Sequence, residues 1–258
     1  MNFIFYIFVG ALGLCIGSFL NCVIYRLEEK KTLKGRSSCP HCKNTLSWKD
    51  LFPILSFIIL GGKCRYCKKI ISWQYPVMEV ATGFLFLSVF NLQMSLPEFT
   101  MPEFFNLLYL FYITSVLIII FVYDFKHYLI PDKILFPAIV VSLFYQFFFS
   151  EHFLNHIGAG IIASGFFLAI FLISKGKWMG FGDVKLAILM GLFLGVRSVL
   201  VALFMAFFLG AVISIILMFL KKKGLKSEIP FGPFLIAGTF IALFFGSQVV
   251  SWYLNLII

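Results

Sequence analysis

Charged residues are scarce in this sequence of 258 residues. They make up 12% of the chain, whereas apolar residues make up 61% and the mean hydropathy is +1.01. A soluble domain carries roughly a quarter charged residues. The scarcity of charge therefore excludes a soluble globular protein and indicates a protein that crosses a membrane several times.

Common hydrolase signatures are also missing. The sequence contains neither a GxSxG nucleophile motif nor an HExxH zinc-ligand motif, which argues against serine and zinc-dependent hydrolysis. The first apolar run has no basic residue before Arg26. A secretory signal peptide has its basic residues in front of the apolar run, so we do not expect this segment to be a cleaved signal peptide.

Eight apolar stretches approach the length of about 20 residues that crosses a bilayer as a helix. They are residues 1–25, 77–95, 104–123, 134–150, 153–174, 183–195, 198–220 and 231–257. The predicted fold class is an all-α polytopic membrane protein with about eight transmembrane helices. Segment 26–75 is the large polar insertion. In the first stretch, Gly10, Gly13 and Gly17 recur at helical spacing, which predicts close packing against another helix.

The position of the basic residues decides what the net charge of +10 means. Of the 21 Lys and Arg residues, 20 fall in alternate connections between the predicted spans, and only Arg197 falls on the opposite side. The positive-inside rule makes the basic side cytoplasmic, so both termini are expected outside. The charge then predicts contact with anionic lipid headgroups, for example through Lys221–Lys223, and no nucleic-acid partner.

Four of the six cysteines form two CxxC pairs in the polar insertion. Cys39 and Cys42 are separated from Cys64 and Cys67 by 21 residues, a pattern typical of a tetrahedral thiolate site for zinc. Two disulfides or four free thiols are the alternatives, and disulfides are rare in the cytoplasm. Four thiolates leave no position for water, so the predicted role of the zinc is structural.

Asp124 ends the third predicted span, and acids bordering apolar runs usually mark function. At the end of a helix its negative charge opposes the helix dipole. An ion pair with Lys126 or His127 is the structural alternative. Two other acids have simpler explanations. Asp132 suits an N-cap of the fourth span, and Glu79 suits either the dipole of the second span or a polar ligand contact.

Asp183 opens the sixth predicted span within the motif Gly180-Phe-Gly182-Asp183-Val-Lys185. A helix N-cap is the alternative role for this aspartate. The glycines are predicted to allow strained backbone angles and the close approach of an extended substrate. Because the two intervening spans make one round trip, Asp124 and Asp183 are expected at the same cytoplasmic boundary.

Two carboxyl groups at one site can share a proton. The ionised group takes a proton from water while the protonated group polarises a carbonyl, so the pair is predicted to cleave a peptide bond. Two other hypotheses stay open. One is a proton- or cation-coupled transporter that uses intramembrane carboxylates, and the other is a zinc-stabilised membrane scaffold without catalysis.

Together these motifs resemble the type IV prepilin peptidases, which are GxGD-type membrane aspartyl proteases. The resembling segments occur in order over most of the chain: Gly17-Ser-Phe-Leu-Asn21 with Val23-Ile-Tyr-Arg26, Cys39-Pro-x-Cys42, Trp48 with Pro53 and Ser56, Gly62-Lys-Cys64-Arg-x-Cys67, Ile71-Ser72 to Tyr75-Pro76-x-x-Glu79, Asp124, Ile130-Pro131-Asp132, and Gly180-x-Gly182-Asp183-x-Lys185. One departure is Leu51, where many members have asparagine.

The resemblance implies cleavage of the short basic leader of type IV prepilins or pseudopilins at the cytoplasmic face of the bacterial inner membrane. Asp124 and Asp183 match the two catalytic aspartates. Gly180, Gly182 and Lys185 match the motif that supports the second one. By this resemblance, residues 96–258 form a six-helix peptidase domain.

The resemblance also implies a second activity. Many members of the family methylate the new N-terminal amine with S-adenosylmethionine, an activity associated with the cysteine-bearing N-terminal region, here residues 1–95. Gly62 and Glu79 are the residues that would be associated with methyl transfer in this chain.

Overall fold

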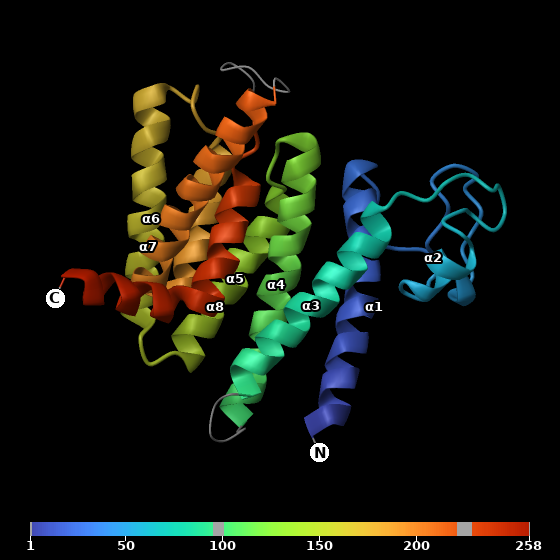
Figure 1. Cartoon of the computed structure of the whole chain (residues 1–258), viewed down its shortest axis with the longest axis horizontal. Coiled ribbons are helices and arrows are strands. Elements are labelled where there is room, and N and C mark those ends of the chain that lie inside the picture. Colours follow the sequence, from blue (N-terminus) through green and yellow to red (C-terminus); the bar gives the residue numbers. More distant parts are fainter. Residues whose placement is uncertain (1, 95–100, 221–228, 258) are drawn as a thin grey trace. The chain divides into compact units, whose positions relative to one another are not determined.

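Helices form nearly all of the regular structure (Figure 1). The computed structural model describes residues 2–94, 101–220 and 229–257, so the predicted lipid anchor Lys221–Lys223 lies outside the described residues. The helices are α1 (Asn2–Glu28), η1 (Trp48–Asp50), α2 (Leu55–Ile59), α3 (Gln74–Met94), α4 (Met101–His127), α5 (Asp132–Phe149), α6 (Phe153–Ser174), α7 (Phe181–Phe219) and α8 (Gly232–Ile257). Strand pairing in the described part of the chain is limited to two isolated bridges, so the all-α fold class is confirmed.

The chain divides into two compact units, Met1–Ile119 and Ile120–Ile258. The division falls inside α4, so Asp124 belongs to the second unit together with Asp183. The first unit contains the cysteine-bearing insertion. The predicted domain boundary between residues 95 and 96 is meant to divide two activities and not two packing units, and it stays a prediction.

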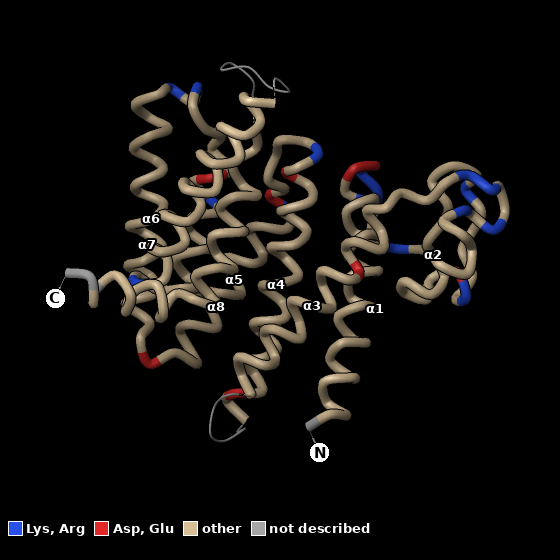
Figure 2. The backbone as a smooth tube through the Cα atoms, in the orientation of Figure 1, with Lys and Arg blue, Asp and Glu red and all other residues tan. Residues whose placement is uncertain are grey.

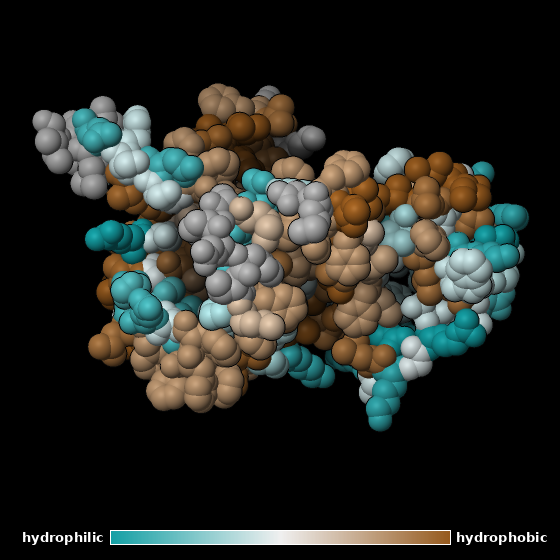
Figure 3. Space-filling view, turned by 90° about the horizontal axis from the view of Figure 1, so that it is seen from below, coloured by the Kyte–Doolittle hydropathy of each residue, from teal (hydrophilic) through white to brown (hydrophobic). Residues whose placement is uncertain are grey.

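Seven helices of the described residues are long and apolar enough to cross a membrane, namely α1 and α3 to α8. Their outward faces are apolar, as in α5, where Phe144, Phe147 and Phe148 are each more than half exposed. Apolar residues (brown) cover much of the face shown in Figure 3. Exposed apolar area of this extent fits contact with lipid, and we describe the chain as a multi-pass membrane protein.

The predicted count of eight spans is not confirmed, because seven helices of the described residues are counted as candidate spans. Predicted spans 183–195 and 198–220 both fall within α7, a stretch of 39 residues in which two helices meet at a kink. A straight helix of that length would extend roughly 58 Å, about twice the hydrocarbon thickness of a bilayer. However, α7 is interrupted at Gly195, where φ is 74° and ψ is 172°, angles that few residues other than glycine adopt. The carbonyl of Leu192 beside this interruption accepts a hydrogen bond from Gln146 Nε2 at 3.0 Å.

Contacts with α6 show that the chain reverses direction at Gly195. In the first half of α7, the ring of Phe181 lies 5.4 Å from that of Phe171 near the end of α6, and Gly195 lies against the start of α6. In the second half, the ring of Phe207 lies 6.1 Å from that of Phe167, again towards the end of α6. The two halves of α7 therefore run along α6 in opposite directions.

In the first unit, α1 packs closely against α3 through glycines. A Cβ atom added at Gly13 would fall 2.8 Å from Cα of Gly83, and one added at Gly17 would fall 2.7 Å from Cα of Glu79. Side chains larger than hydrogen do not fit there, so the predicted small-residue packing face is confirmed for these two positions.

Lys and Arg lie mostly at helix ends and in the insertion around α2, with few along the membrane helices (Figure 2). This distribution is the one on which the topology prediction rests. The side of the membrane that each end faces stays a prediction.

Candidate functional site

Asp124 lies in the last turn of α4 and is only 5% exposed. Its carboxylate accepts a hydrogen bond from the backbone N–H of Gly232, the first residue of α8. A Cβ atom added at Gly232 would overlap Oδ2 of Asp124 and would fall 3.2 Å from its Cγ. The backbone at the start of α8 thus packs directly against this carboxylate.

Asp183 is the third residue of α7 and is 7% exposed. The alternative role as an N-cap is not what the structure shows, because Gly180 occupies the N-cap position. The carboxylate of Asp183 interacts instead with the backbone N–H of Gly180. An acid in the first turn of a helix is stabilised by the helix dipole, which offsets part of the cost of burying this carboxylate.

The structure brings the two aspartates together around Ile130. A Cβ atom at Gly182, which precedes Asp183, would lie 3.2 Å from Cβ of Ile130, and one at Gly232 would lie 3.6 Å from Cδ1 of the same side chain. In addition, the charge of Asp124 acts on the carboxyl group of Asp183. Both acids are buried and the charge of one acts on the other, which is compatible with a shared proton.

The expectation of strained angles at Gly180 and Gly182 is wrong. Gly180 has φ −77° and ψ 150°, and Gly182 lies inside α7, so other residues can adopt both conformations. The two glycines differ in how much room a side chain would have. A Cβ at Gly182 would press on Ile130, whereas the nearest atom to one at Gly180 is Oδ2 of Asp183 at 3.9 Å.

Lys185 bridges α7 and α5. Its Nζ lies 2.6 Å from Oδ1 of Asp132, and it also lies over the rings of Phe136 and Phe181. The predicted N-cap role of Asp132 is wrong, because Pro131 is the N-cap and Asp132 is the first helical residue. The ion pair connects the helix that carries Asp183 to the helix that follows Ile130.

The four cysteines of the first unit converge. The Sγ atoms of Cys39, Cys42, Cys64 and Cys67 all lie within 4.8 Å of one another, and those of Cys39 and Cys67 are 3.9 Å apart. Four sulfurs at about 2.3 Å from a tetrahedral zinc ion would be roughly 3.8 Å apart. The cluster therefore has the dimensions of a metal site.

Each CxxC pair forms a similar turn. In the first, Cys39 N donates to Asn44 O and Lys43 N donates to Cys39 O; in the second, Cys64 N donates to Lys69 O and Lys68 N donates to Cys64 O. Both Lys43 and Lys68 have φ of 59°. The repeated geometry presents two sulfurs from each turn to the same point.

The thiols of the cluster differ in acidity. Burial alone would raise the pKa of Cys39, but hydrogen bonds from the backbones of Cys42 and His41 lower it to about 7. A backbone hydrogen bond at Asn44 favours the thiolate of Cys42, but burial and the nearby sulfurs outweigh it and raise its pKa to about 11. One thiolate is thus readily formed, and a second in the same place is opposed until a cation is present.

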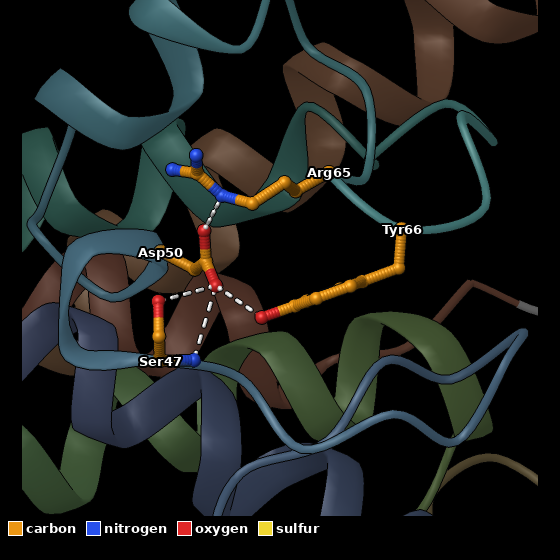
Figure 4. Close-up of polar contacts among 4 residues, drawn as sticks. All are labelled: Ser47, Asp50, Arg65 and Tyr66. Carbon is orange, nitrogen blue, oxygen red and sulfur yellow. Dashed lines mark hydrogen bonds and ion pairs between the residues drawn. The ribbon is translucent and has the colours of Figure 1, made fainter.

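Asp50 ties the two cysteine turns together (Figure 4). Its Oδ2 accepts hydrogen bonds from Ser47 N at 3.0 Å, Ser47 Oγ at 2.7 Å and Tyr66 OH at 3.4 Å. Its Oδ1 lies 2.6 Å from Arg65 Nε, and the side chain of Asp50 is 3% exposed. Burial would raise the pKa of Asp50, but the bonds from Arg65 and Ser47 hold it below its usual range. The sequence alone does not point to Asp50, since a single acid in a basic loop forms no motif.

Glu79 holds a strained turn of the insertion. It is 6% exposed in α3, and its Oε2 accepts a hydrogen bond of 2.7 Å from the backbone N–H of Ile54. Ile54 has φ 60° and ψ −50°, and Leu55 N donates to Pro53 O across it. This is the rare and strained form of γ-turn, so the carboxylate stabilises a conformation that a β-branched residue otherwise avoids.

A pocket of about 380 Å³ opens in the first unit between the end of α1, the start of α3 and the insertion. Its wall includes Arg26, Leu51, Phe57 and Glu79. Arg26 donates to backbone carbonyls of the segment 32–36, the shortest of these bonds being 2.7 Å. Gly62, predicted to take part in methyl transfer, is outside the wall. It has φ 68° and packs against the ring of Phe57.

Two family models match the chain in separate regions. Residues 11–92 match the "Bacterial Peptidase A24 N-terminal domain", and residues 111–215 match the "Type IV leader peptidase family". The "Prepilin leader peptidase/N-methyltransferase" of Bacillus subtilis is 31% identical over 252 residues, which cover 95% of this chain and 96% of the relative. The chain belongs to the prepilin leader peptidase/N-methyltransferase family.

Other relatives carry the same name. The one from Legionella pneumophila is 29% identical over 283 residues, covering 97% of this chain and 94% of its own length. The one from Vibrio cholerae is 32% identical over 205 residues, covering 74% of this chain and 78% of its own length. No solved structure matches the chain. Membership in this family does not favour the transporter hypothesis.

The matched regions separate the two sites. The match to the N-terminal domain contains the four cysteines and the pocket residue Glu79, and the match to the peptidase family contains Asp124 and Asp183. Gly232, which contacts Asp124, lies beyond both matches. No motif around it pointed to the aspartates, because the contact joins segments that are distant along the chain.

Proposed function

We propose that the protein cleaves the leader of type IV prepilins or pseudopilins with Asp124 and Asp183 as the catalytic pair. The observation that carries this proposal is the convergence of two buried carboxyl groups around Ile130, within a chain of the prepilin leader peptidase family. Buried acids in a membrane helix bundle are costly unless they have a function.

In the proposed reaction, the ionised aspartate takes a proton from a water molecule, and the oxygen of that water molecule attacks the scissile carbonyl carbon. The protonated aspartate donates its proton to the carbonyl oxygen, which gives a neutral tetrahedral intermediate. Collapse of the intermediate breaks the C–N bond, and a proton passes to the leaving amine. The pair shares its proton, so the roles belong to Asp124 and Asp183 jointly.

The substrate suits a site at a membrane surface. A prepilin joins a basic leader to an apolar helix, so the helix can lie in the bilayer while the leader stays in the water. We place the aspartates at the cytoplasmic face of the bacterial inner membrane, because the Lys and Arg residues concentrate on that side of the predicted topology. Lipid contacts along the outward helix faces complete the environment.

We further propose that Cys39, Cys42, Cys64 and Cys67 hold a structural zinc ion. The fit rests on the sulfur separations and on the two matching turns. A small polar loop has too little apolar core to fold stably, and metal binding can supply the missing free energy. Asp50 would then keep the two turns in register around the ion.

We also propose that the pocket of the first unit holds S-adenosylmethionine, which supplies an electrophilic methyl group for the new N-terminal amine. A volume of about 380 Å³ falls in the usual range of small-molecule sites, about 300–1,000 Å³. Lys34 and Lys69 in the wall suit a carboxylate group. Tyr25 and Phe57 offer rings for an adenine, and Glu79 offers a buried carboxylate for an amine or a sulfonium.

A mass-spectrometric assay tests the proposed activities. The purified protein in detergent is incubated with a prepilin, first alone and then with S-adenosylmethionine. We expect removal of the leader in both samples and a methylated N-terminus only in the second. An intact prepilin in both would overturn the peptidase proposal, and a cleaved but never methylated product would overturn the methyltransfer proposal.

A further inference from the structure

The start of α8 lies against Asp124, and nothing in the reaction described above uses it. Only 5% of Asp124 is exposed, and the backbone N–H of Gly232 donates a hydrogen bond to its carboxylate. Pro233 follows, and α8 then runs away from the site from Gly232 to Ile257. The positive end of the α8 dipole is therefore directed at this aspartate.

The fit between Gly232 and Asp124 leaves no room for a side chain. A Cβ atom at position 232 would come closer to Oδ2 of Asp124 than real Cβ atoms approach other atoms, and it would fall 3.2 Å from Cγ. The obstructing atoms belong to a short, buried carboxylate. An alanine at this position would have to displace Asp124 or the start of α8.

The start of α8 is itself anchored. The ring of Phe231 lies 5.1 Å from that of Phe207 and 6.1 Å from that of Phe167, which ties the residue before Gly232 to α7 and α6. On the other side, Ile130 touches the Cβ positions of both Gly232 and Gly182. The segment cannot easily retreat from Asp124 because these contacts surround it.

We propose that Gly232 is a positioning residue for the peptidase reaction, and this inference rests on the proposed function of Asp124. Its N–H donates to the Asp124 carboxylate and fixes the orientation of that group. Its missing side chain leaves the space that Oδ2 occupies. Phe231 and Ile130 keep this donor in place and relate it to the segment that carries Asp183.

The variant Gly232→Ala should lose turnover rather than substrate binding. The added methyl group would move the carboxylate by about 1 Å, and a displacement of this size in a catalytic group costs about 100-fold in rate. We therefore expect kcat for leader cleavage to fall about 100-fold with KM for the prepilin almost unchanged. An effect on folding alone would lower the amount of active enzyme and the unfolding midpoint instead.

The test compares kcat and KM of wild type, Gly232→Ala, Gly246→Ala and Asp124→Asn in detergent, with thermal unfolding of each. Gly246 lies in the same helix, and a Cβ there would be 3.5 Å from Ser198 Oγ, an ordinary contact, so we expect full activity from that variant. Wild-type kcat in a folded Gly232→Ala protein, with Asp124→Asn inactive, would overturn this inference alone. Full activity of Asp124→Asn would overturn the proposed function itself.

A second variant keeps the inference testable if Gly232→Ala is not recovered in folded form. Phe231→Leu leaves Gly232 and Asp124 unchanged but removes the ring contacts that anchor the start of α8. We expect kcat to fall several-fold with KM unchanged. Wild-type kcat in this variant, with Gly232→Ala unfolded, would overturn the proposal.

Discussion

Replacing Asp50 by asparagine tests whether the two cysteine turns depend on one another. Asparagine has nearly the same shape but no charge, and its NH₂ group cannot accept hydrogen bonds. In the wild type, Ser47 N and Ser47 Oγ both donate to Oδ2 of Asp50, at 3.0 and 2.7 Å. Both bonds would change from charge-assisted to neutral at best.

The size of the effect follows from these two bonds. A hydrogen bond to a charged group contributes about 1 kcal/mol more than one between neutral groups, which gives about 2 kcal/mol for the pair. The ion pair with Arg65 is left out, because the side chain of Arg65 is 45% exposed and solvent screens it. If folding of the loop and zinc binding are coupled, about 2 kcal/mol lowers the apparent zinc affinity roughly 30-fold.

The assay is competition for zinc with a coloured chelator, using detergent-purified protein at neutral pH. Glu29→Gln is the matched control, because Glu29 pairs with Lys31 at 3.1 Å on an exposed part of the chain; it should retain wild-type affinity. An Asp50→Asn protein that holds zinc as tightly as the wild type would refute this reasoning.

The same interaction has a defined pH dependence. The pKa of Asp50 is lowered in the folded protein, so its contribution to stability is present above the unfolded-state value of about 3.9. It is lost as the pH falls through the lower folded-state pKa. Asp50→Asn should lack this component when unfolding of the metal-free protein is followed against pH.

Two further predictions concern the cysteine cluster and the kink in α7. The double variant Cys39→Ser/Cys64→Ser should contain no bound zinc by elemental analysis, and undiminished zinc would remove the metal assignment. Gly195→Ala should unfold at a lower temperature than the wild type, because φ there is 74° and a Cβ would fall 2.6 Å from Asn155 Nδ2. Gly165→Ala is its control, since no atom lies within 4 Å of a Cβ there, and equal unfolding temperatures for these two variants would contradict the prediction.

The features that sequence alone predicted are those set by local pattern. Paired cysteines at fixed spacing predicted the cluster. Apolar runs with acids at their ends predicted that Asp124 and Asp183 act as a pair, and their catalytic role stays a prediction. Contacts between distant segments were not predictable in this way. The approach of Gly232 to Asp124 and the placement of Asp50 between two turns depend on how helices and loops pack, which single residues do not encode.

Local sequence pattern also led to wrong predictions for the roles of some individual residues. Glycine and aspartate each suit several positions near the start of a helix. Gly180 is the N-cap of α7, whereas Asp132 is the first residue of α5 and pairs with Lys185. These roles depend on neighbouring residues and not on residue type alone. By contrast, the predicted end of a span at Gly195 agrees with the structure, where non-helical backbone angles at this residue separate the two halves of α7.

The most direct measurement of the central claim is the rate of leader removal by Asp124→Asn and Asp183→Asn, each purified in detergent and shown to be folded. Glu151→Gln, at an exposed position between α5 and α6, serves as the control for removing an acid. We expect both aspartate variants to leave the prepilin intact while the control cleaves it at the wild-type rate. Cleavage at the wild-type rate by either aspartate variant would contradict a mechanism in which the two carboxyl groups act together.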